Sequence, residues 1–478
     1  MVARPLVQGR KAGRLRTRRE VLRAGTKSAL GILGAAVASF VPEVRRGRAA
    51  RRVTRPNFVV VLSDNHRADA IGIAGHPFVR TPALDRLARE GVRFERAYCT
   101  TPLCSPARAS FLTGLYAYRH GVKNHTTQAS WDEKLVTFFE LLQSQAGYRN
   151  GFVGKWHMPA SPLPRLRGVE RFVTFTIEGG QGRYFDCPLV VDGRPEPSRR
   201  RYITEELTDR AIDFVREGPE PFCLYLAHKA VHHPWKPPPD LEGIYSDEPV
   251  HLPKGANSWT GFTNGQIWGG FDRPVESAYR AYMETVTGMD REIGRLLRFL
   301  DDRGLAGRTF VLYASDNGFL FGEHKRVELR WPFEEVIRIP WIVRWPQGVE
   351  RPGRVARQMV LNLDLAPTLL ELAGLDVPDW MQGRSFLPVL ADPDAPGRRA
   401  WLVENYREFP YRVPGYQGVH TERYLYVEYE GCWKPSLHDL LNDPKQERDL
   451  YGTEEGDRVL PELRRLLAGL RHGEKFDA

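Results

Sequence analysis

The sequence is poor in cysteine: five occur in 478 residues, and none belongs to a Cys-x-x-Cys pair. This scarcity excludes a small disulfide-stapled scaffold and argues against a structural zinc site. The length and the 42% share of hydrophobic residues are sufficient for a large folded core. They predict roughly two or three domains, or one large α/β domain with an appendage.

The body of the chain also lacks a net charge, although the whole chain carries +10. Residues 1–50 hold 12 Lys and Arg against 2 Asp and Glu, so this segment accounts for the whole excess. Residues 51–478 are balanced, which removes the main support for a nucleic-acid-binding protein. We therefore expect no nucleic-acid partner.

The N-terminal segment lacks an apolar run as long as the roughly 20 residues that a membrane-spanning helix needs. It has instead the order of an export signal: an Arg-rich stretch, an uncharged apolar run over 28–42 and a small-residue end near Ala50. The pair Arg18-Arg19 before a mildly apolar run is typical of a twin-arginine signal. Residues 1–50 are therefore predicted to direct export to the periplasm or the outside through the twin-arginine machinery. A basic disordered tail or an uncleaved anchor is the alternative.

Apolar runs alternate with amphipathic stretches along the body. The runs 57–64, 221–227, 309–316 and 339–345 predict buried strands, and 136–146 and 278–300 predict helices. This alternation predicts an α/β fold with a mostly parallel sheet, in which ligands bind at the carboxyl ends of strands. Two of the runs end in Asp64-Asn65 and Asp316-Asn317. The fold rule alone therefore points to these side chains.

Two further regions differ from the rest of the chain in composition or in hydrophobic pattern. Residues 159–202 are rich in Pro, Gly and Arg and are expected to form an irregular insertion. From residue 381 the pattern changes to short strands at 401–405 and 423–429 and a last helix at 459–471. We therefore place a catalytic domain at 53–380 and a smaller C-terminal α+β subdomain at 381–478.

One stretch carries most of the chemical information: Cys104-Ser-Pro106-Ala-Arg108-Ala-Ser-Phe-Leu-Thr-Gly114. Pro106 favours a helix start, so Cys104 is expected beside the free N–H groups of a helix N-terminus, where anions bind. Arg108 adds a charged guanidinium nearby. Taken alone, Cys104 could equally be a buried structural thiol, a redox thiol or a catalytic group.

The same stretch resembles the sulfatase signature, in which the Cys is oxidised to formylglycine, and the resemblance extends over nearly all of residues 55–455. The motifs that carry it, besides the signature, are Asn57 to Asp64, 81–98, Gly154-Lys155-Trp156-His157, Val231-His232-His233-Pro234-Trp235, Ser315-Asp316-Asn317-Gly318, Gly322-Glu323-His324, Phe333-Glu334-Glu335 and Ser436 to Pro444. Their order along the chain makes a chance match very improbable. The resemblance implies an alkaline-phosphatase-like fold and a sulfuric ester hydrolase.

The resemblance also implies a set of site residues. One Ca²⁺ or Mg²⁺ would be bound by Asp64, Asn65, Asp316, Asn317 and the modified Cys104, since oxygen ligands suit hard cations. Arg108 and Lys155 would neutralise the formylglycine hydrate and the sulfate, His157 would help the hydrate to form or collapse, and His232 would assist the leaving oxygen. The implied partners are a sulfated small molecule or glycan and a formylglycine-generating enzyme.

The chain departs from the family pattern at two positions. Asn65 stands where a second Asp is usual, so the cation site has one negative charge fewer. Leu329 stands where the family often has a sulfate-contacting Lys, and Arg330 or Lys325 are the candidates to replace it. His66, His76, His120, His228, His233 and His324 are interpreted as solvated or structural and receive no role.

Two other functions remain open at this stage. Phosphonate monoester hydrolases and phosphodiesterases of the same superfamily can share the Cys-x-Pro-x-Arg motif. A non-catalytic sulfoglycan-binding relative is the third possibility, and the retained Cys104, Arg108, Lys155 and His157 argue against it. The particular sulfate ester cannot be identified from the sequence. Residues 179–184 and 234–271 are the segments expected at the rim of the pocket.

Overall fold

The computed structural model describes residues 55–125, 131–158, 166–176, 180–252, 274–409 and 411–477. The export signal predicted at 1–50 lies outside these residues. Residues 53–478 form one compact unit. Among the described residues, no helix combines the length and apolar character needed to cross a bilayer.

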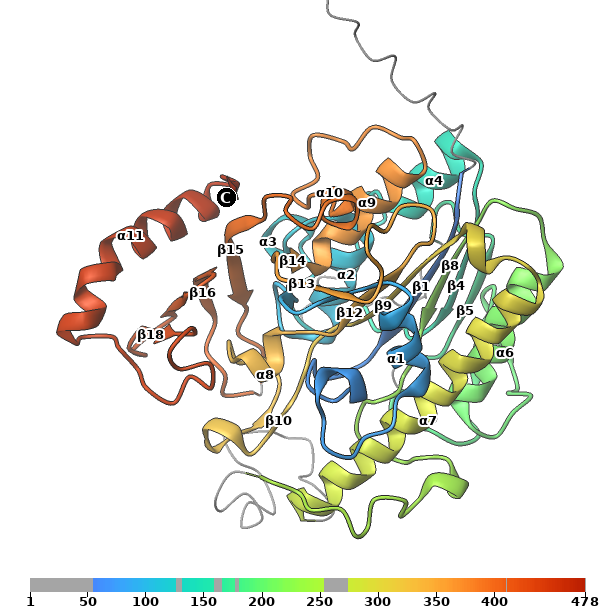
Figure 1. The fold of residues 1–478 in the computed structure, drawn as a ribbon, viewed down its shortest axis with the longest axis horizontal. Helices are drawn as coiled ribbons and strands as arrows, with labels where there is room; N and C mark the ends of the chain where they lie inside the picture. Colours follow the sequence, from blue (N-terminus) through green and yellow to red (C-terminus); the bar gives the residue numbers. More distant parts are fainter. Residues whose placement is uncertain are drawn as a thin grey trace, which may run out of the picture. The chain divides into compact units, whose positions relative to one another are not determined.

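A ten-stranded mixed sheet forms the centre of this unit (Figure 1). Its strands, in spatial order, are β13 (Arg354–Ala356), β2 (Val92–Phe94), β12 (Trp341–Arg344), β9 (Thr309–Ser315), β1 (Asn57–Ser63), β8 (Phe222–Ala227), β4 (Arg149–Gly154), β5 (Arg171–Thr174), β6 (Leu189–Val191) and β7 (Arg194–Glu196). The five strands from β9 to β5 are parallel to one another. The predicted α/β fold with a mostly parallel sheet is confirmed.

Helices cover both faces of the sheet (Figure 1). On one face lie α1 (Pro82–Arg89), α6 (Ile203–Glu217) and α7 (Val275–Asp302); on the other lie α2 (Cys104–Thr113), α4 (Phe138–Ala146) and α9 (Leu365–Leu372). The central strand β1 is buried along its whole length, which explains its unbroken apolar sequence. Shorter helices are α3 (Ala117–His120), α8 (Glu334–Ile337) and α10 (Leu387–Ala391).

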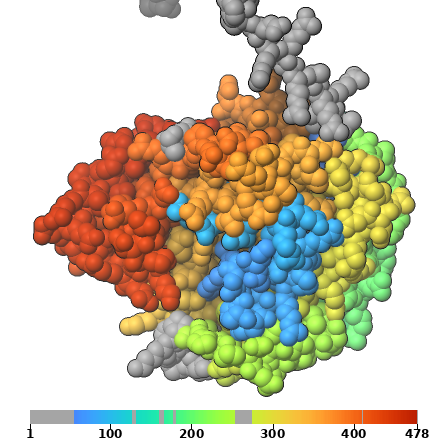
Figure 2. Space-filling model, in the orientation of Figure 1, coloured from blue at the N-terminus to red at the C-terminus, as the bar shows by residue number. Residues whose placement is uncertain are grey.

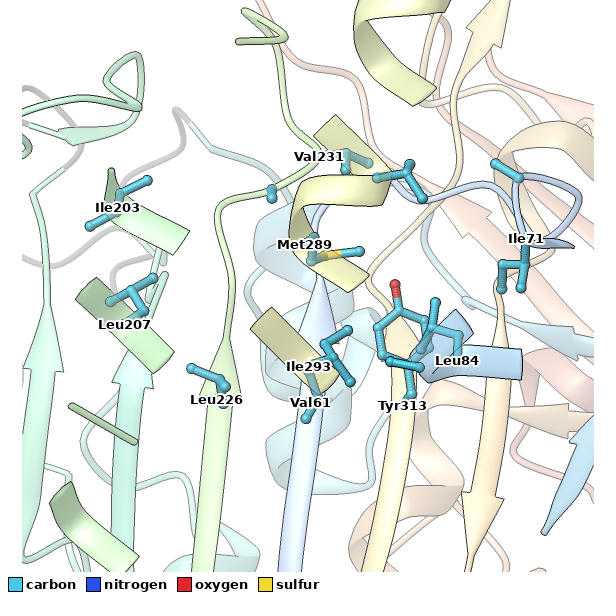
Figure 3. Packing of buried hydrophobic residues seen from close by; sticks show 14 of the residues in the cluster. Val61, Ile71, Leu84, Ile203, Leu207, Leu226, Val231, Met289, Ile293 and Tyr313 are labelled. Carbon is cyan, nitrogen blue, oxygen red and sulfur yellow. The ribbon is translucent and has the colours of Figure 1, made fainter. Parts of the chain in front are cut away.

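Alternate side chains of β1 enter two different cores. Val59 and Val61 pack with α1, α6 and α7, whereas Phe58, Val60 and Leu62 pack with α2, α4 and α9. Figure 3 shows Val61 in the first of these cores, facing Met289 and Ile293 of α7. The long amphipathic stretch 278–300 is therefore core, as its helical spacing of apolar residues predicted.

The expectation of an irregular insertion at 159–202 is wrong in part. The strands β5, β6 and β7 lie within it and extend the central sheet at one edge. Each has only three or four residues, and β7 contains Pro195. Such short strands give no period-two pattern, and proline is tolerated because β7 lies at the edge of the sheet.

A second sheet lies in the C-terminal part of the chain. Its strand order is β18 (Ser436–Asp439), β17 (Tyr424–Tyr429), β16 (Tyr416–Thr421), β15 (Arg398–Asn405) and β19 (Phe476–Asp477), all antiparallel, and α11 (Glu454–Arg471) packs against it. Its core includes Tyr98, Ile337 and Leu361 from the catalytic region. Figure 2 shows this segment, in red, in continuous contact with the orange segments before it. The smaller C-terminal α+β subdomain is confirmed, and its boundary at residue 380 stays a prediction.

Two small ladders complete the fold. They pair β10 (Leu320–Phe321) with β11 (Val327–Glu328) and β3 (Ala97–Tyr98) with β14 (Val360–Leu361). The first begins three residues after Asn317, and the second joins the segment before α2 to the segment before α9. Both ladders therefore fix loops that lead to or from the strand ends described next.

Candidate active site

Four neighbouring parallel strands end at one place in the structure. In the spatial order β9, β1, β8, β4, the residues that follow them are Asp316-Asn317, Asp64-Asn65, Lys229 to His232 and Lys155 to His157. Cys104 begins α2 beside them. The rule that ligands bind at the carboxyl ends of parallel strands therefore applies to four consecutive strands at once.

The ends of β1 and β9 are held in register. Ser63 is paired with Ser315, so Asp64 and Asp316 leave the sheet at the same level. The Asn65 N–H donates to Asp316 Oδ1 at 3.0 Å. All of these side chains are buried. Two carboxylates are thereby brought together out of contact with water.

The thiol of Cys104 lies against this pair of strand ends. Its Sγ is 3.5 Å from Asp64 Oδ1 and 3.7 Å from Asn65 Oδ1. One oxygen each from Asp64 and Asp316 lies within 4.8 Å of the other and of Sγ. Cys104 is thus placed where a group derived from it would meet the carboxylates.

The donor set fits a hard divalent cation. Asn317 Oδ1 is buried and accepts no hydrogen bond from the residues that the structure describes, while its Nδ2 donates to Asn65 Oδ1 at 2.8 Å. Burial raises the pKa of Asp316, and the charge of Asp64 raises it further. A bound cation would reduce the repulsion between the two carboxylates and would give the Asn317 amide oxygen a partner. Carboxylate and amide oxygens are the ligands that Ca²⁺ and Mg²⁺ prefer.

Two buried cations neighbour the carboxylates. Arg108, the fifth residue of α2, lies with Nη2 2.7 Å and Nε 2.9 Å from Asp316 Oδ2, and its Nη1 donates to the Lys155 carbonyl at 3.0 Å. Lys155 Nζ forms an ion pair with Asp64 Oδ2. Although burial disfavours the charged guanidinium, Asp316 and Asp64 hold the pKa of Arg108 above its ordinary value. The site therefore keeps fixed positive charge in a dry environment.

Gly154 allows Lys155 to reach this position. The backbone of Gly154 has φ +116°, and a Cβ there would lie 1.9 Å from the Ala227 carbonyl oxygen. The next residue donates its N–H to that same carbonyl at 2.8 Å. Only glycine permits β4 to approach β8 this closely at the strand end.

Burial makes Cys104 itself a poor nucleophile. It raises the pKa of the thiol well above its ordinary value, and the attraction of Lys155 does not offset this effect. A thiol rather than a thiolate is therefore present near neutral pH. The environment is suited to a different group at position 104, one that does not need to ionise in order to react.

Two histidines lie on the other side of Cys104. Ligand atoms of Cys104, His125 and His157 lie within 4.8 Å of one another, and the two imidazole rings are 4.5 Å apart. Burial lowers the pKa of both histidines well below the ordinary value, and Lys155 adds to the effect. Ser105 Oγ donates to the His157 carbonyl. Both rings are therefore neutral and next to the position of the nucleophile.

His232 follows β8 and is held by its neighbours. Its Nδ1 faces the His233 carbonyl, and its Nε2 lies 3.1 Å from Gln181 Nε2. Tyr184 Oη donates to the His232 carbonyl at 2.6 Å. Burial lowers the pKa of His232 well below its ordinary value, with contributions from the positive charges of Lys155 and Lys229. His232 is therefore neutral when no anion is bound.

The structure thus gathers every residue that the sequence singled out. The ends of the four strands and the start of α2 hold Asp64, Asn65, Cys104, Arg108, Lys155, His157, His232, Asp316 and Asn317. Their individual roles stay predictions. His125 and Lys229 also belong to this cluster and were missed, since no motif includes His125 and Lys229 lies two residues before the motif that begins at Val231. His125 is positioned by Glu408, which accepts its backbone N–H at 2.7 Å.

The comparisons with known proteins agree with this geometry. The sulfatase family model matches residues 56–375, and a model for the C-terminal part of N-sulphoglucosamine sulphohydrolase matches residues 322–473. The chain is 30% identical to an N-acetylglucosamine-6-O-sulfatase of Bacteroides thetaiotaomicron over 86% of each chain. It is 26% identical to an arylsulfatase of Clostridium perfringens over 86% of this chain and 94% of that one.

Among solved structures, the chain resembles a protein determined in complex with its substrate D-glucosamine-2-N,6-O-disulfate. The TM-score is 0.79 at 26% identity, covering 88% of this chain and 98% of the other. Fold, matched motifs and relatives together define a sulfuric ester hydrolase of the alkaline-phosphatase-like class. The chain belongs to the sulfatase family.

Proposed function

We propose that this sulfatase removes the 6-O-sulfate from a glucosamine unit of a small sugar or glycan. The relatives support this substrate: an N-acetylglucosamine-6-O-sulfatase matches 86% of the chain, and the structural relative holds a 6-O-sulfated glucosamine. The observation that carries the proposal is the position of Cys104 at the start of α2, with Sγ 3.5 Å from Asp64 Oδ1 and beside two buried cations.

We further propose that Cys104 is converted to formylglycine by a formylglycine-generating enzyme and that the site binds one Ca²⁺ or Mg²⁺. Asp64, Asn65, Asp316 and Asn317 would hold the ion together with the modified Cys104. When present, the ion supplies positive charge for the sulfate oxygens, and the formylglycine hydrate supplies the attacking hydroxyl. The orphaned amide oxygen of Asn317 and the two apposed carboxylates support this assignment.

In this proposal, Arg108 and Lys155 bind and orient negative charge. Arg108 is fixed by Asp316 and by the Lys155 carbonyl, so its guanidinium costs little reorganisation when the sulfate reacts. Lys155 is fixed by Asp64. His157 is neutral and its buried Nδ1 has no hydrogen-bond partner among the described residues, so it can accept a proton from a hydroxyl group at position 104.

His232 is proposed to protonate or hydrogen-bond the leaving sugar oxygen. Its low pKa reflects burial and two nearby lysines, and a bound sulfate anion would raise that pKa. Gln181 Oε1 has no hydrogen-bond partner among the described residues. Rotation of this amide would let Gln181 Oε1 accept a hydrogen bond from the protonated Nε2 of His232. Gln181 can therefore stabilise either protonation state of His232.

We also propose that residues 1–50 direct export through the twin-arginine machinery to the periplasm or the cell exterior. The support is the order of the segment: paired arginines, an uncharged apolar run and a small-residue end. Fusing residues 1–50 to a reporter and replacing Arg18-Arg19 by Lys-Lys tests this route. Export should be lost in the replaced fusion, and unchanged export would refute the assignment.

The test of the substrate is sulfate release from a matched panel. Glucosamine 6-sulfate should be cleaved at least tenfold faster than glucosamine 3-sulfate and galactosamine 6-sulfate, and Cys104→Ala should release no sulfate. Mass spectrometry across Cys104 in protein from its native host should show the aldehyde. Turnover of phosphate diesters or phosphonate monoesters with little sulfate release would favour the superfamily alternative instead. Binding of the sugar by the wild-type protein without turnover would favour a sulfoglycan-binding protein.

A further inference from the structure

Position 329, where the family pattern often has a lysine, brings no cation to the site. The Leu329 side chain is buried and belongs to the hydrophobic core that also contains residues of α1, α6 and α7. Of the two replacements considered from the sequence, Arg330 is paired with carboxylates and Lys325 lies at the surface. The Arg330 guanidinium pairs with Glu328 and, at 2.6 Å, with Glu408 Oε2, and Lys325 is exposed.

Lys229 carries a buried side-chain amine that the mechanism above does not use, and burial lowers its pKa to about 7. It follows β8 by two residues and has no exposed surface. Its Nζ lies 3.7 Å from the centre of the Tyr184 ring and has no hydrogen-bond partner among the described residues. A buried donor group without an acceptor is unfavourable, so an external acceptor would stabilise it.

The backbone around Lys229 is fixed to the strand that carries Asp64. The Asp64 N–H donates to the Ala230 carbonyl at 3.0 Å, and the Val231 N–H donates to the Asp64 carbonyl at 2.9 Å. The His232 N–H donates back to the Lys229 carbonyl at 3.0 Å. Lys229 is therefore held at a defined place between the proposed cation ligands and the proposed leaving-group histidine.

The electrostatic neighbours of Lys229 face the same site. Asp64 and Lys155 both act on its charge, and its own charge acts on His232. The face of the Tyr184 ring partly stabilises the protonated form of Lys229. The Tyr184 hydroxyl already donates its hydrogen bond to the His232 carbonyl. Among the described residues, the amine of Lys229 is thus left as an N–H donor without an acceptor, with Asp64 and Lys155 among its electrostatic neighbours.

We propose that Lys229 binds a sulfate oxygen and takes the place of the cation that Leu329 does not provide. This inference rests on the proposed anion site at Cys104, Arg108 and Lys155. A sulfate oxygen would accept the charge-assisted hydrogen bond that Lys229 lacks. Lysine supplies this charge from the end of β8, whereas position 329 lies after β11.

The test uses the full chain and two readouts. Lys229→Met keeps the length of the side chain and removes its charge. We expect the inhibition constant of inorganic sulfate and the KM for glucosamine 6-sulfate to rise at least tenfold. Lys236→Met, which removes an exposed lysine of the same loop, is the matched control and should leave both unchanged.

Calorimetric binding of inorganic sulfate to the unconverted protein gives a measure that does not need turnover. If Lys229→Met unfolds, Lys229→Gln replaces it in the same measurements. Unchanged sulfate affinity in a folded Lys229 variant would overturn the inference while leaving the proposed function intact. Absence of sulfate release by the wild-type enzyme, with sulfate binding still dependent on Lys229, would instead refute the function and keep the anion site.

Discussion

Asn317 Nδ2 donates a hydrogen bond to Asn65 Oδ1 at 2.8 Å, which joins the amides at the ends of β9 and β1. Asn65 has φ +59°, a conformation that both Asn and Asp adopt readily. Asn65→Asp should therefore keep the backbone and the hydrogen bond while adding a negative charge to the proposed cation site. We expect roughly tenfold tighter Ca²⁺ binding, because ligand charge strongly tunes Ca²⁺ affinity.

Isothermal calorimetry on chelator-treated protein measures this change. Asn65→Ala, which removes the amide oxygen, is the companion variant and should bind the ion more weakly than the wild-type protein. Equal affinities in all three proteins would mean that residue 65 does not contribute a ligand.

Arg108→Lys should reduce kcat by about 10²–10³-fold. Lysine keeps the charge but cannot reproduce the two contacts from Nε and Nη2 to Asp316 together with the third contact to the Lys155 carbonyl. Steady-state kinetics on a sulfate ester, with metal content measured in parallel, tests this. A kcat within a factor of three of the wild-type value would show that only the charge of Arg108 matters.

Gly154→Ala should lower both stability and activity. The added Cβ would lie 1.9 Å from the Ala227 carbonyl oxygen and would force a residue with a side chain into φ +116°. We expect a loss of at least about 2 kcal/mol in the free energy of unfolding. Thermal unfolding and kcat are the measurements. Gly307→Ala, where a Cβ meets no atom within 4 Å, is the control and should behave as wild type.

Glu404 is expected to make stability depend on pH. Burial raises the pKa of its carboxyl to about 7, although Tyr406 Oη and the Ala117 N–H bond to it. Because this pKa is raised, the contribution of Glu404 to the free energy of unfolding is fully present below its pKa in the unfolded chain, near 4.5. That contribution is lost as the pH rises through 7. Between these limits the loss is about 3 kcal/mol.

Glu404→Gln removes this titration. Relative to wild type, the variant should therefore be more stable at pH 8 than at pH 5, as measured by urea unfolding at both values. Glu462→Gln, at an exposed position of α11, should show no such relative gain. A parallel pH profile for Glu404→Gln and wild type would contradict the assignment.

The strand ends were predictable from the sequence because each strand and the polar residues that end it form one short continuous segment. β1 and β9 are unbroken apolar runs buried on both faces, and each ends in an Asp-Asn pair. The rule for parallel sheets then brings Asp64 and Asp316 together without knowledge of the rest of the fold. The roles assigned to Lys155 and His157 came from the resemblance to sulfatases and not from local pattern.

Other parts depend on contacts between distant segments. Strands β5 to β7 are too short for a pattern and exist because β4 offers an edge to pair with. His125 lies beside Cys104 because Glu408, far along the chain, accepts its backbone N–H. Lys229 becomes an anion-facing group only when β8 lies between β1 and β4. No local signal distinguishes these residues from ordinary loop residues.

The burial of Cys104 also has a consequence for timing during synthesis. The thiol is buried, and part of its surroundings enters the chain much later: Asp316 lies 208 residues after its partner Arg108. At about 5–20 residues per second, a ribosome needs roughly 10–40 s to add that length. Throughout this interval Cys104 has been made but cannot yet be enclosed. The proposed modification therefore has a time window set by translation, and it ends when β9 joins the sheet.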